Sequence, residues 1–141
     1  MKVLVAWDQP EQIELLECYL GLGEHKLGWA TTAEEMLTHV EAQVWDIVLM
    51  SVKLPDAEQG FQAFEQLHRL QPDTPVVGAC EPQEVFRIVR FMANGMSAYV
   101  IRDANSDYLF MLLNVLESTV ESARASREQK ILEKLREEID S

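Results

Sequence analysis

Cysteine is scarce in this chain, since only Cys18 and Cys80 occur among its 141 residues. Two thiols so far apart make neither a disulfide framework nor a metal-binding spacing, so we interpret both as reduced, buried thiols. Long hydrophobic runs are also missing. None approaches the roughly 20 apolar residues that cross a bilayer, and Asp8 comes too early for a signal peptide. We therefore expect a cytoplasmic protein that does not contact a membrane.

Positive charge is the second shortage. Lysine and arginine number 12 against 24 aspartate and glutamate residues, which gives a formal net charge of -12. That charge repels a nucleic-acid backbone and an anionic membrane surface. We therefore expect no direct contact with nucleic acid, and we expect proteins as the partners. Hydrophobic residues make up 48% of the chain, which suits a single domain with a proper core.

What the chain does contain is a fivefold alternation of apolar runs and amphipathic stretches. The apolar runs predict strands at residues 2–6, 26–30, 46–51, 74–79 and 98–101. The stretches between them predict helices, the third following a loop marked by Pro55 and Gly60, the fourth at residues 82–94. Strands joined by helices form a parallel sheet through right-handed crossovers. We therefore predict an α/β fold, a doubly wound five-stranded parallel sheet with βα repeated five times and a long C-terminal helix.

In sheets of this kind, ligands bind beyond the carboxyl ends of the strands. The candidate site therefore consists of the residues at those ends, which are Trp7, Asp8, Ser51, Cys80 and Arg102. None of the three histidines lies near a strand end in the predicted fold. A serine without a neighbouring base is a poor nucleophile, so we predict no catalytic residue and no enzyme activity.

The C-terminal segment, from about Ser106 to Asp140, has neither proline nor glycine. One apolar stripe contains Leu109, Leu112, Leu113, Leu116 and Val120, and a second contains Ile131, Leu132, Leu135 and Ile139. The second stripe has no sheet to cover it, so we expect a coiled coil, with a solvated tail as the alternative. The stripes differ in register, which predicts a stutter near residues 123–127. The pattern stops without a helix stop signal, and we expect the helix to continue into another module.

Four stretches near the strand ends have a distinctive order and spacing. The predicted strand at residues 2–6 is followed by Trp7 and a single acid, Asp8, and Ser51 stands four residues before Pro55. Residues 74–80 read Thr-Pro-Val-Val-Gly-Ala-Cys, and residues 94–103 read Asn-Gly-Met-Ser-Ala-Tyr-Val-Ile-Arg-Asp. Over roughly residues 1–118, the chain resembles the receiver domain of bacterial two-component response regulators, which has a flavodoxin-like fold.

The resemblance implies a phosphorylation chemistry that most of these positions have lost. In the family, a pair of acids and a phosphorylated aspartate bind Mg²⁺, while a hydroxyl and a lysine contact the phosphoryl group. At the matching positions this chain has Trp7 and Asp8 for the acids, Ser51 for the aspartate, Cys80 for the hydroxyl and Arg102 for the lysine. We therefore predict a degenerate pseudo-receiver without a phosphate-accepting aspartate, and we expect neither a metal nor a cofactor.

Several arrangements could replace the lost chemistry. Arg102 could pair with Asp8, or the two charges could be solvated separately. Trp7 could fill the emptied pocket or pack against the first loop, and a small anion could bind Arg102. Asp8 or Asp56 could accept a phosphoryl group instead, which would make the chain a still-responsive phosphorelay regulator, although a turn position after proline explains Asp56 equally well.

The resemblance also implies a partner surface. In the family, the fourth helix, fifth strand and fifth helix form the usual dimer and partner face, and Tyr99 matches an aromatic that reports phosphorylation. We expect Tyr99 to be a fixed packing residue here. The predicted interface residues, with those of the helix, are Arg87, Arg90, Phe91, Tyr99, Leu113, Leu116, Val120, Leu132, Leu135 and Ile139. An ordinary mixed surface is the alternative.

The functional hypothesis combines these observations. We predict a receiver-like domain at residues 1–118 that is not phosphorylated and acts by protein contacts and homodimerisation. Residues 119–141 would be a helical extension that joins it to an output module. A flavodoxin-like flavin carrier is the hypothesis from another class, but residues 7–10 lack the serine- or glycine-rich loop that cradles a flavin phosphate.

Overall fold

A five-stranded parallel sheet forms the centre of the molecule. The structure, a computed structural model, describes residues 1–103, 105 and 107–140. The strands are β1 (Lys2–Ala6), β2 (Lys26–Ala30), β3 (Ile47–Ser51), β4 (Val76–Cys80) and β5 (Ala98–Ile101). Their order across the sheet is β2-β1-β3-β4-β5, and all neighbouring pairs are parallel. The five predicted strands and the doubly wound α/β fold are therefore confirmed.

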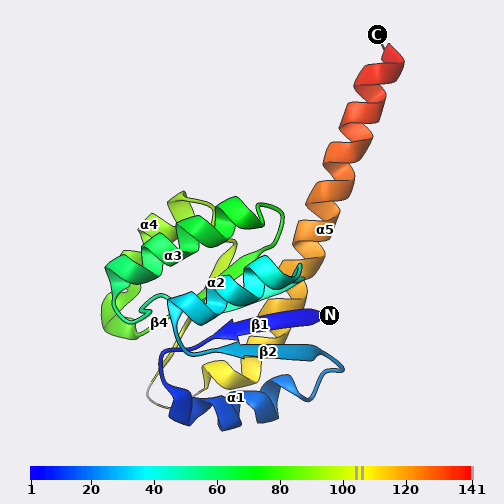
Figure 1. The fold of residues 1–141 in the computed structure, drawn as a ribbon. Coiled ribbons are helices and arrows are strands. Elements are labelled where there is room, and N and C mark those ends of the chain that lie inside the picture. The colour runs from blue at the N-terminus through cyan, green and yellow to red at the C-terminus, as the bar shows by residue number, and fades with distance from the viewer. Residues whose placement is uncertain (104, 106, 141) are drawn as a thin grey trace.

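Helices cover both faces of the sheet (Figure 1). They are the 3₁₀ turn η1 (Pro10–Gln12), α1 (Ile13–Leu20), α2 (Ala33–Ala42), α3 (Ala57–Leu70), the 3₁₀ segment η2 (Pro82–Arg87), α4 (Ile88–Ala93) and α5 (Tyr108–Asp140). Side chains of α2, α3 and α4 share one core cluster, whereas those of α1 and α5 share the other. No helix among the described residues is both long and apolar enough to cross a membrane.

The central strands are apolar at nearly every position because both faces of the sheet are covered. In β3, Ile47 and Leu49 belong to the cluster under α1 and α5. Val48 and Met50 belong to the cluster under α2, α3 and α4. Alternate residues of a strand point to opposite faces, and a parallel strand buried on both faces is therefore an unbroken apolar run.

The third helix begins earlier than we predicted. It starts at Ala57, and Asp56 caps it because its Oδ1 accepts a hydrogen bond of 2.8 Å from the amide of Gln59. Gly60 therefore lies inside the helix and not in the preceding loop. A Cβ at this position would collide with the carbonyl oxygen of Val52. The glycine permits a close approach of helix and strand, a role that the sequence pattern did not distinguish from a loop.

The predicted fourth helix is divided into two parts. Residues Pro82–Arg87 form the 3₁₀ segment η2, and only Ile88–Ala93 form the α-helix α4. A helix of only six residues covers little of the neighbouring surface. Phe86 of η2 and Val89 of α4 are both solvent-exposed. Phe86 lines a surface cavity with residues of α3, including Phe61.

The C-terminal helix α5 divides into a packed half and an exposed half. Leu109, Leu112, Leu116 and Val120 are buried against the sheet and α1. Val120 is the last buried residue of the helix, and Ala123 and Lys130 still line a surface pocket with residues of the domain. The helix then continues beyond the domain to Asp140, as the red end of Figure 1 shows. Ser106, where we expected this helix to begin, lies outside the described residues. Leu116 and Val120 are core residues of their own domain, so the prediction that they are interface residues was wrong.

Candidate functional site

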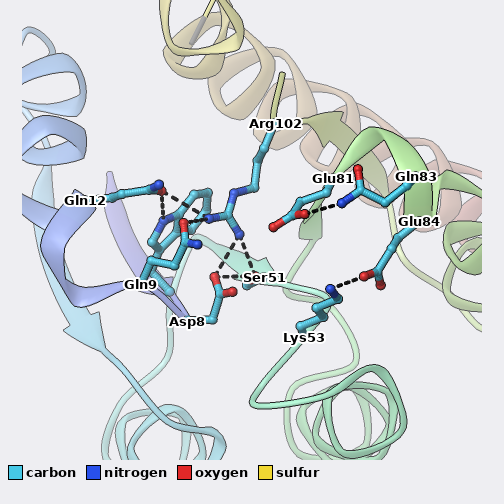
Figure 2. Close-up of polar contacts among 10 residues, drawn as sticks. Asp8, Gln9, Gln12, Ser51, Lys53, Glu81, Gln83, Glu84 and Arg102 are labelled. Atoms are coloured by element: carbon cyan, nitrogen blue, oxygen red, sulfur yellow. Dashed lines mark hydrogen bonds and ion pairs between the residues drawn. The ribbon is translucent and has the colours of Figure 1, made fainter. Parts of the chain in front are cut away.

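The candidate site lies at the carboxyl edge of the sheet. Trp7 and Asp8 directly follow β1, Ser51 ends β3, Cys80 ends β4, and Arg102 directly follows β5. Because parallel strands all end at the same edge, these residues gather although they come from distant parts of the sequence. Figure 2 shows Arg102 reaching across this edge toward Asp8 and Ser51.

Arg102, Asp8 and Ser51 form a closed triangle of hydrogen bonds. The Arg102 Nη1 donates to Asp8 Oδ1 at 2.8 Å and to Ser51 Oγ at 3.0 Å. The Ser51 hydroxyl donates in turn to the same Asp8 oxygen at 2.8 Å. The Asp8–Arg102 pair weighed against two solvated charges is therefore present. A charge-assisted contact of this length is stronger than a neutral hydrogen bond.

Two glutamines complete the surroundings of the guanidinium. Arg102 Nη2 donates to the side-chain oxygens of both Gln9 and Gln12, the latter at 3.1 Å. The Gln12 oxygen also accepts a 2.9 Å hydrogen bond from the indole nitrogen of Trp7. Sequence reasoning missed both glutamines, since a glutamine in a loop belongs to no motif. Their only signal was their position, within five residues of the single acid.

The indole ring of Trp7 packs against the guanidinium of Arg102. Arg102 Cζ lies 4.4 Å from the centroid of the indole ring, which is a favourable distance for a cation–π contact. Trp7 is 0% exposed, Ser51 1% and Arg102 8%. This burial agrees with both roles considered for Trp7, since the indole also belongs to the core cluster under α1 and α5 and bonds Gln12 of η1. The arginine is thus a desolvated cation whose donors have partners, as a buried charge requires.

The residues present do not fit Mg²⁺. A hard divalent cation prefers several carboxylate or carbonyl oxygens, and Asp8 supplies the only carboxylate among the five strand-end residues. Its Oδ1 already accepts from Arg102 and Ser51. Among the described residues, no three histidine, cysteine, aspartate or glutamate side chains are grouped as a metal site would need. A guanidinium next to the remaining carboxylate repels a second cation.

A second ion pair lies beside this triangle. Lys53, in the loop after β3, pairs with Glu84 of η2, and the Arg87 Nε lies 3.3 Å from the same carboxylate. Figure 2 shows Lys53 turned toward Glu84 and away from Arg102. The hydrogen bond to Glu84 raises the pKa of Lys53. The lysine therefore connects the β3–α3 loop with η2, and no motif or spacing in the sequence predicts this pairing.

Cys80 and Tyr108 line the neighbourhood without joining the triangle. Burial raises the pKa of the Cys80 thiol, and Glu84 raises it further while Arg102 lowers it. Burial likewise raises the pKa of Tyr108, again against the lowering effect of Arg102. Both groups are therefore neutral near pH 7, and the buried Cys80 is a packing residue, not a reactive thiol. Cys18, which we expected to be buried, is exposed.

The cavity at the mouth of the site has a volume of about 390 Å³. Gln9, Gln12, Arg102 and Tyr108 are among the residues that line it, together with the acids Glu81 and Asp103. The side-chain nitrogens of Arg102 that face this opening already donate to the two glutamines. An anion at this arginine, one of our earlier alternatives, would have to displace those glutamine oxygens.

The remaining predicted residues lie away from the triangle. Asp56 caps α3 through both carboxylate oxygens, which accept from Gln59. Tyr99 is exposed beside a groove between β5 and α5. Arg87 and Arg90 are exposed beside a cavity shared with α3, where Glu58 holds Arg90 at 3.0 Å. Phe91 is buried in the core cluster under α3 and α4, so its assignment to an exposed interface was wrong. The amphipathic pattern of residues 82–94 did not show that Phe91 faces the core while Phe86 faces solvent.

The comparisons with known proteins agree with this geometry. Residues 3–114 match the family described as the response regulator receiver domain. Over 110 residues, 76% of the chain, the sequence is 30% identical to the two-component response regulator ORR27 of Oryza sativa subsp. japonica. The alignment covers only 17% of that relative, so the chain spans a small part of its length.

Solved structures share the fold at low sequence identity. NtrX from Brucella abortus is similar with a TM-score of 0.80 at 20% identity, over 93% of this chain and 29% of that one. A CheY-like response regulator receiver domain protein from Methanospirillum hungatei JF-1 is similar with a TM-score of 0.77 at 22% identity, over 89% and 97% of the two chains. The predicted flavodoxin-like fold is thus confirmed.

Three independent observations now agree. The strand order β2-β1-β3-β4-β5 is that of a flavodoxin-like sheet. The candidate residues lie at the sheet edge where such folds place their sites, and the family match extends over most of the chain. The chain therefore belongs to the family of response regulator receiver domains, which are signalling domains.

Proposed function

We propose that this receiver domain is not phosphorylated and that it signals through protein contacts. The observation that carries the proposal is the position of Arg102, whose guanidinium bonds Asp8 and Ser51 at the edge where phosphorylation would take place. The proposal has two parts, a site closed by an internal cation and a helix that connects the domain to a partner copy and an output module.

The first support is the chemistry of Ser51. A carboxylate can attack a phosphoryl donor directly, whereas a serine hydroxyl needs an adjacent base. The Ser51 hydroxyl donates to Asp8 Oδ1, but the same oxygen also accepts from the Arg102 guanidinium at 2.8 Å. Asp8 is therefore held by the cation and is not a free base beside the serine. Ser51 is also 1% exposed, so a phosphoryl donor has no access to its hydroxyl.

The second support is that the site is complete without a ligand. Arg102 connects the ends of β5, β1 and β3 through Asp8 and Ser51, and it connects to η1 through Gln12. We infer that these contacts hold the strand ends in one conformation. The domain would then be a constant binding surface, and regulation would come from the partner or from the amount of protein.

The third support concerns residues 119–141, which we propose as a coiled-coil linker that begins where the receiver domain ends. Ile131, Leu132, Leu135 and Ile139 are all exposed in the single chain. Four large aliphatic side chains within nine residues favour a partner helix over water. We propose a homodimer formed through this stripe, with an output module attached to it.

The surface next to α4 and β5 is the proposed docking site for a protein partner. Tyr99 is exposed on β5, and Arg87 and Arg90 are exposed at the end of η2 and on α4. Arginine and tyrosine are enriched among residues that anchor interfaces. A groove of about 410 Å³ lies between β5 and α5, lined by Tyr99, Ile101 and Met111 among others. We name the partner only as a protein, because a mixed apolar and charged surface specifies no more.

Beryllofluoride with Mg²⁺ tests the proposal, because it binds receiver sites that have an acceptor aspartate and a metal. We expect no change in the amide resonances of Ser51, Lys53 and Arg102 in the ¹⁵N-labelled full chain. Incubation with acetyl phosphate followed by intact-mass measurement should add no phosphoryl group. A stoichiometric shift of the Ser51 amide, or a phosphoryl group on Asp8 or Asp56, would show a still-responsive regulator and end the proposal.

A further inference from the structure

The two apolar stripes of α5 point in different directions. A helix turns by about 100° per residue, so direction can be counted from Val120, the last buried residue of α5. Viewed along the helix axis, the mean direction of the four buried side chains lies about 35° before that of Val120. The mean direction of the four exposed aliphatic side chains lies about 75° after it. The exposed stripe is therefore rotated by about 110° from the face that packs on the domain.

The direction of the exposed stripe can be located on the domain. Phe110 and Glu117 lie about 80° and about 60° ahead of Val120, within the same sector of the helix. Phe110 makes an edge-to-face contact with Tyr19 of α1, with ring centroids 5.4 Å apart, and Glu117 lies 3.1 Å from His25. This sector is thus the α1 side of α5.

A different sector of α5, about 105° from the exposed stripe, faces the β5 edge of the sheet. Ser118 and Ser122 lie about 160° and about 200° from Val120, and both line a surface pocket with Ser97, which immediately precedes β5. Met111 and Val115, in the same half of the helix, line the groove beside Tyr99. The exposed stripe therefore points away from the surface that contains Tyr99.

We propose that a second copy of this chain docks in parallel along the α1 side of α5, with the two α1 helices on the facing sides of the dimer. The inference rests on the proposed tail dimer and specifies its geometry. The surface with Arg87, Arg90 and Tyr99 is then on the outside of the dimer, where it is free for another protein. Each dimer would present two such surfaces.

The α1 side has the apolar surface that such a contact needs. The exposed stripe spans nine residues, which is shorter than the three to four heptads typical of an independent coiled coil. A parallel arrangement can extend the contact toward the domain, where Phe110 is 71% exposed. Leu15 is also exposed and lies one turn before Tyr19, on the same face of α1. An antiparallel pair would leave these side chains in water.

Charge sets the strength of the contact. Glu117, Glu121 and Glu128 follow one another along the same sector of α5, and two bases, Arg124 and Arg127, lie between them in the sequence. In a parallel dimer these acids oppose their own copies, and like charges repel until salt screens them. The dimer should therefore tighten as salt rises, and the helices should be closest at the apolar stripe.

Cysteine cross-linking of the full chain tests the geometry. Glu121→Cys and Ser122→Cys are made separately in a Cys18→Ser background, and each is treated with a short bis-maleimide. Cys80 is buried and does not compete. The two positions are adjacent and both exposed, yet their side chains point about 100° apart around the helix, and only Glu121 lies in the sector of the exposed stripe. Each is therefore the matched control of the other. We expect a covalent dimer from Glu121→Cys, with at least fivefold less from Ser122→Cys.

Sedimentation of the unmodified chain separates the possible failures. A dimer that cross-links through Ser122→Cys, or through neither position, overturns the α1-side geometry and leaves the tail dimer standing. A monomer at all concentrations overturns the tail dimer itself and the inference with it. A dimer that weakens in high salt contradicts the arrangement of acids along α5.

Discussion

The guanidinium of Arg102 lies over the indole of Trp7, with Cζ 4.4 Å from the ring centroid. The same guanidinium bonds Asp8 and Ser51 on its other side. A buried cation is stable only with partners for its charge and its donors, and this chain supplies them from β1, β3 and η1. The strand-end residues therefore depend on one another, since Arg102 needs both the ring of Trp7 and the carboxylate of Asp8 to be stable in this buried position.

Replacing the cation should destabilise the domain. Arg102→Met removes one partner of a mostly buried ion pair, and such changes cost about 3–5 kcal/mol when both charges are fully buried. The side chain of Asp8 is 17% exposed and regains some water, so we expect a loss of about 2–4 kcal/mol in the free energy of unfolding. Urea denaturation measures it, with the exposed Arg69→Met as control. Equal stabilities for both variants would contradict the role of Arg102.

Restoring the acceptor carboxylate alone should not restore metal binding. In Ser51→Asp the new carboxylate lies beside Asp8, but Arg102 can pair with both and occupies the space between them. We expect no heat of Mg²⁺ binding in isothermal titration calorimetry of this variant. Ser51→Asp/Arg102→Lys should bind Mg²⁺, because an ammonium group cannot hold the same four partners. Binding by the single variant would show that Arg102 does not block the site.

Asp56 should behave as a helix cap. Its Oδ1 accepts from the amide of Gln59 at 2.8 Å, and loss of such a cap costs about 1 kcal/mol. We expect Asp56→Ala to lose about this much in thermal or urea unfolding, and Asp56→Asn to lose much less, since asparagine caps as well as aspartate. If both variants kept full stability, the capping role would be wrong.

The tail stripe should control association without affecting the domain fold. Leu135 is exposed in the single chain, so Leu135→Glu should leave the urea midpoint of the domain unchanged. In a dimer it would bury an unpaired charge, and we expect the dissociation constant to rise at least tenfold, about 1.4 kcal/mol. Sedimentation equilibrium measures this. Glu133→Gln, on the other side of the helix, is the control and should associate as the original chain does.

Stability should fall in alkaline solution. The pKa values of Cys80 and Tyr108 are raised by burial above their ordinary values of 9.0 and 10.0. The unfolded chain therefore loses these protons at lower pH than the folded chain, so the free energy of unfolding decreases as pH rises through this range. We expect no contribution from either group below about pH 8. In Cys80→Ser the decrease between pH 8 and 10 should be shallower, and an unchanged slope would exclude the thiol as its cause.

Much of this arrangement could be predicted from the sequence. Apolar runs and helical periodicity identified the five strands and the edge at which Trp7, Asp8 and Ser51 meet. Gln9 and Gln12 could not be found this way, because their role depends on where Arg102 reaches. The burial of Phe91 could not be predicted from the sequence pattern either. Periodicity shows that a helix has an apolar and a polar face, but not how completely a short helix is covered by its neighbours.

The continuity of α5 has a mechanical consequence. Leu112 and Leu116 fix its root in the core, while the 20 residues beyond Val120 extend about 30 Å as one helix. This segment is a lever arm. If a protein bound beside Tyr99 tilted the root by about 5°, the far end would move by about 3 Å, enough to change which side chains interdigitate there. A repacking of ångström size at β5 would thus be amplified into a displacement that an attached module could register.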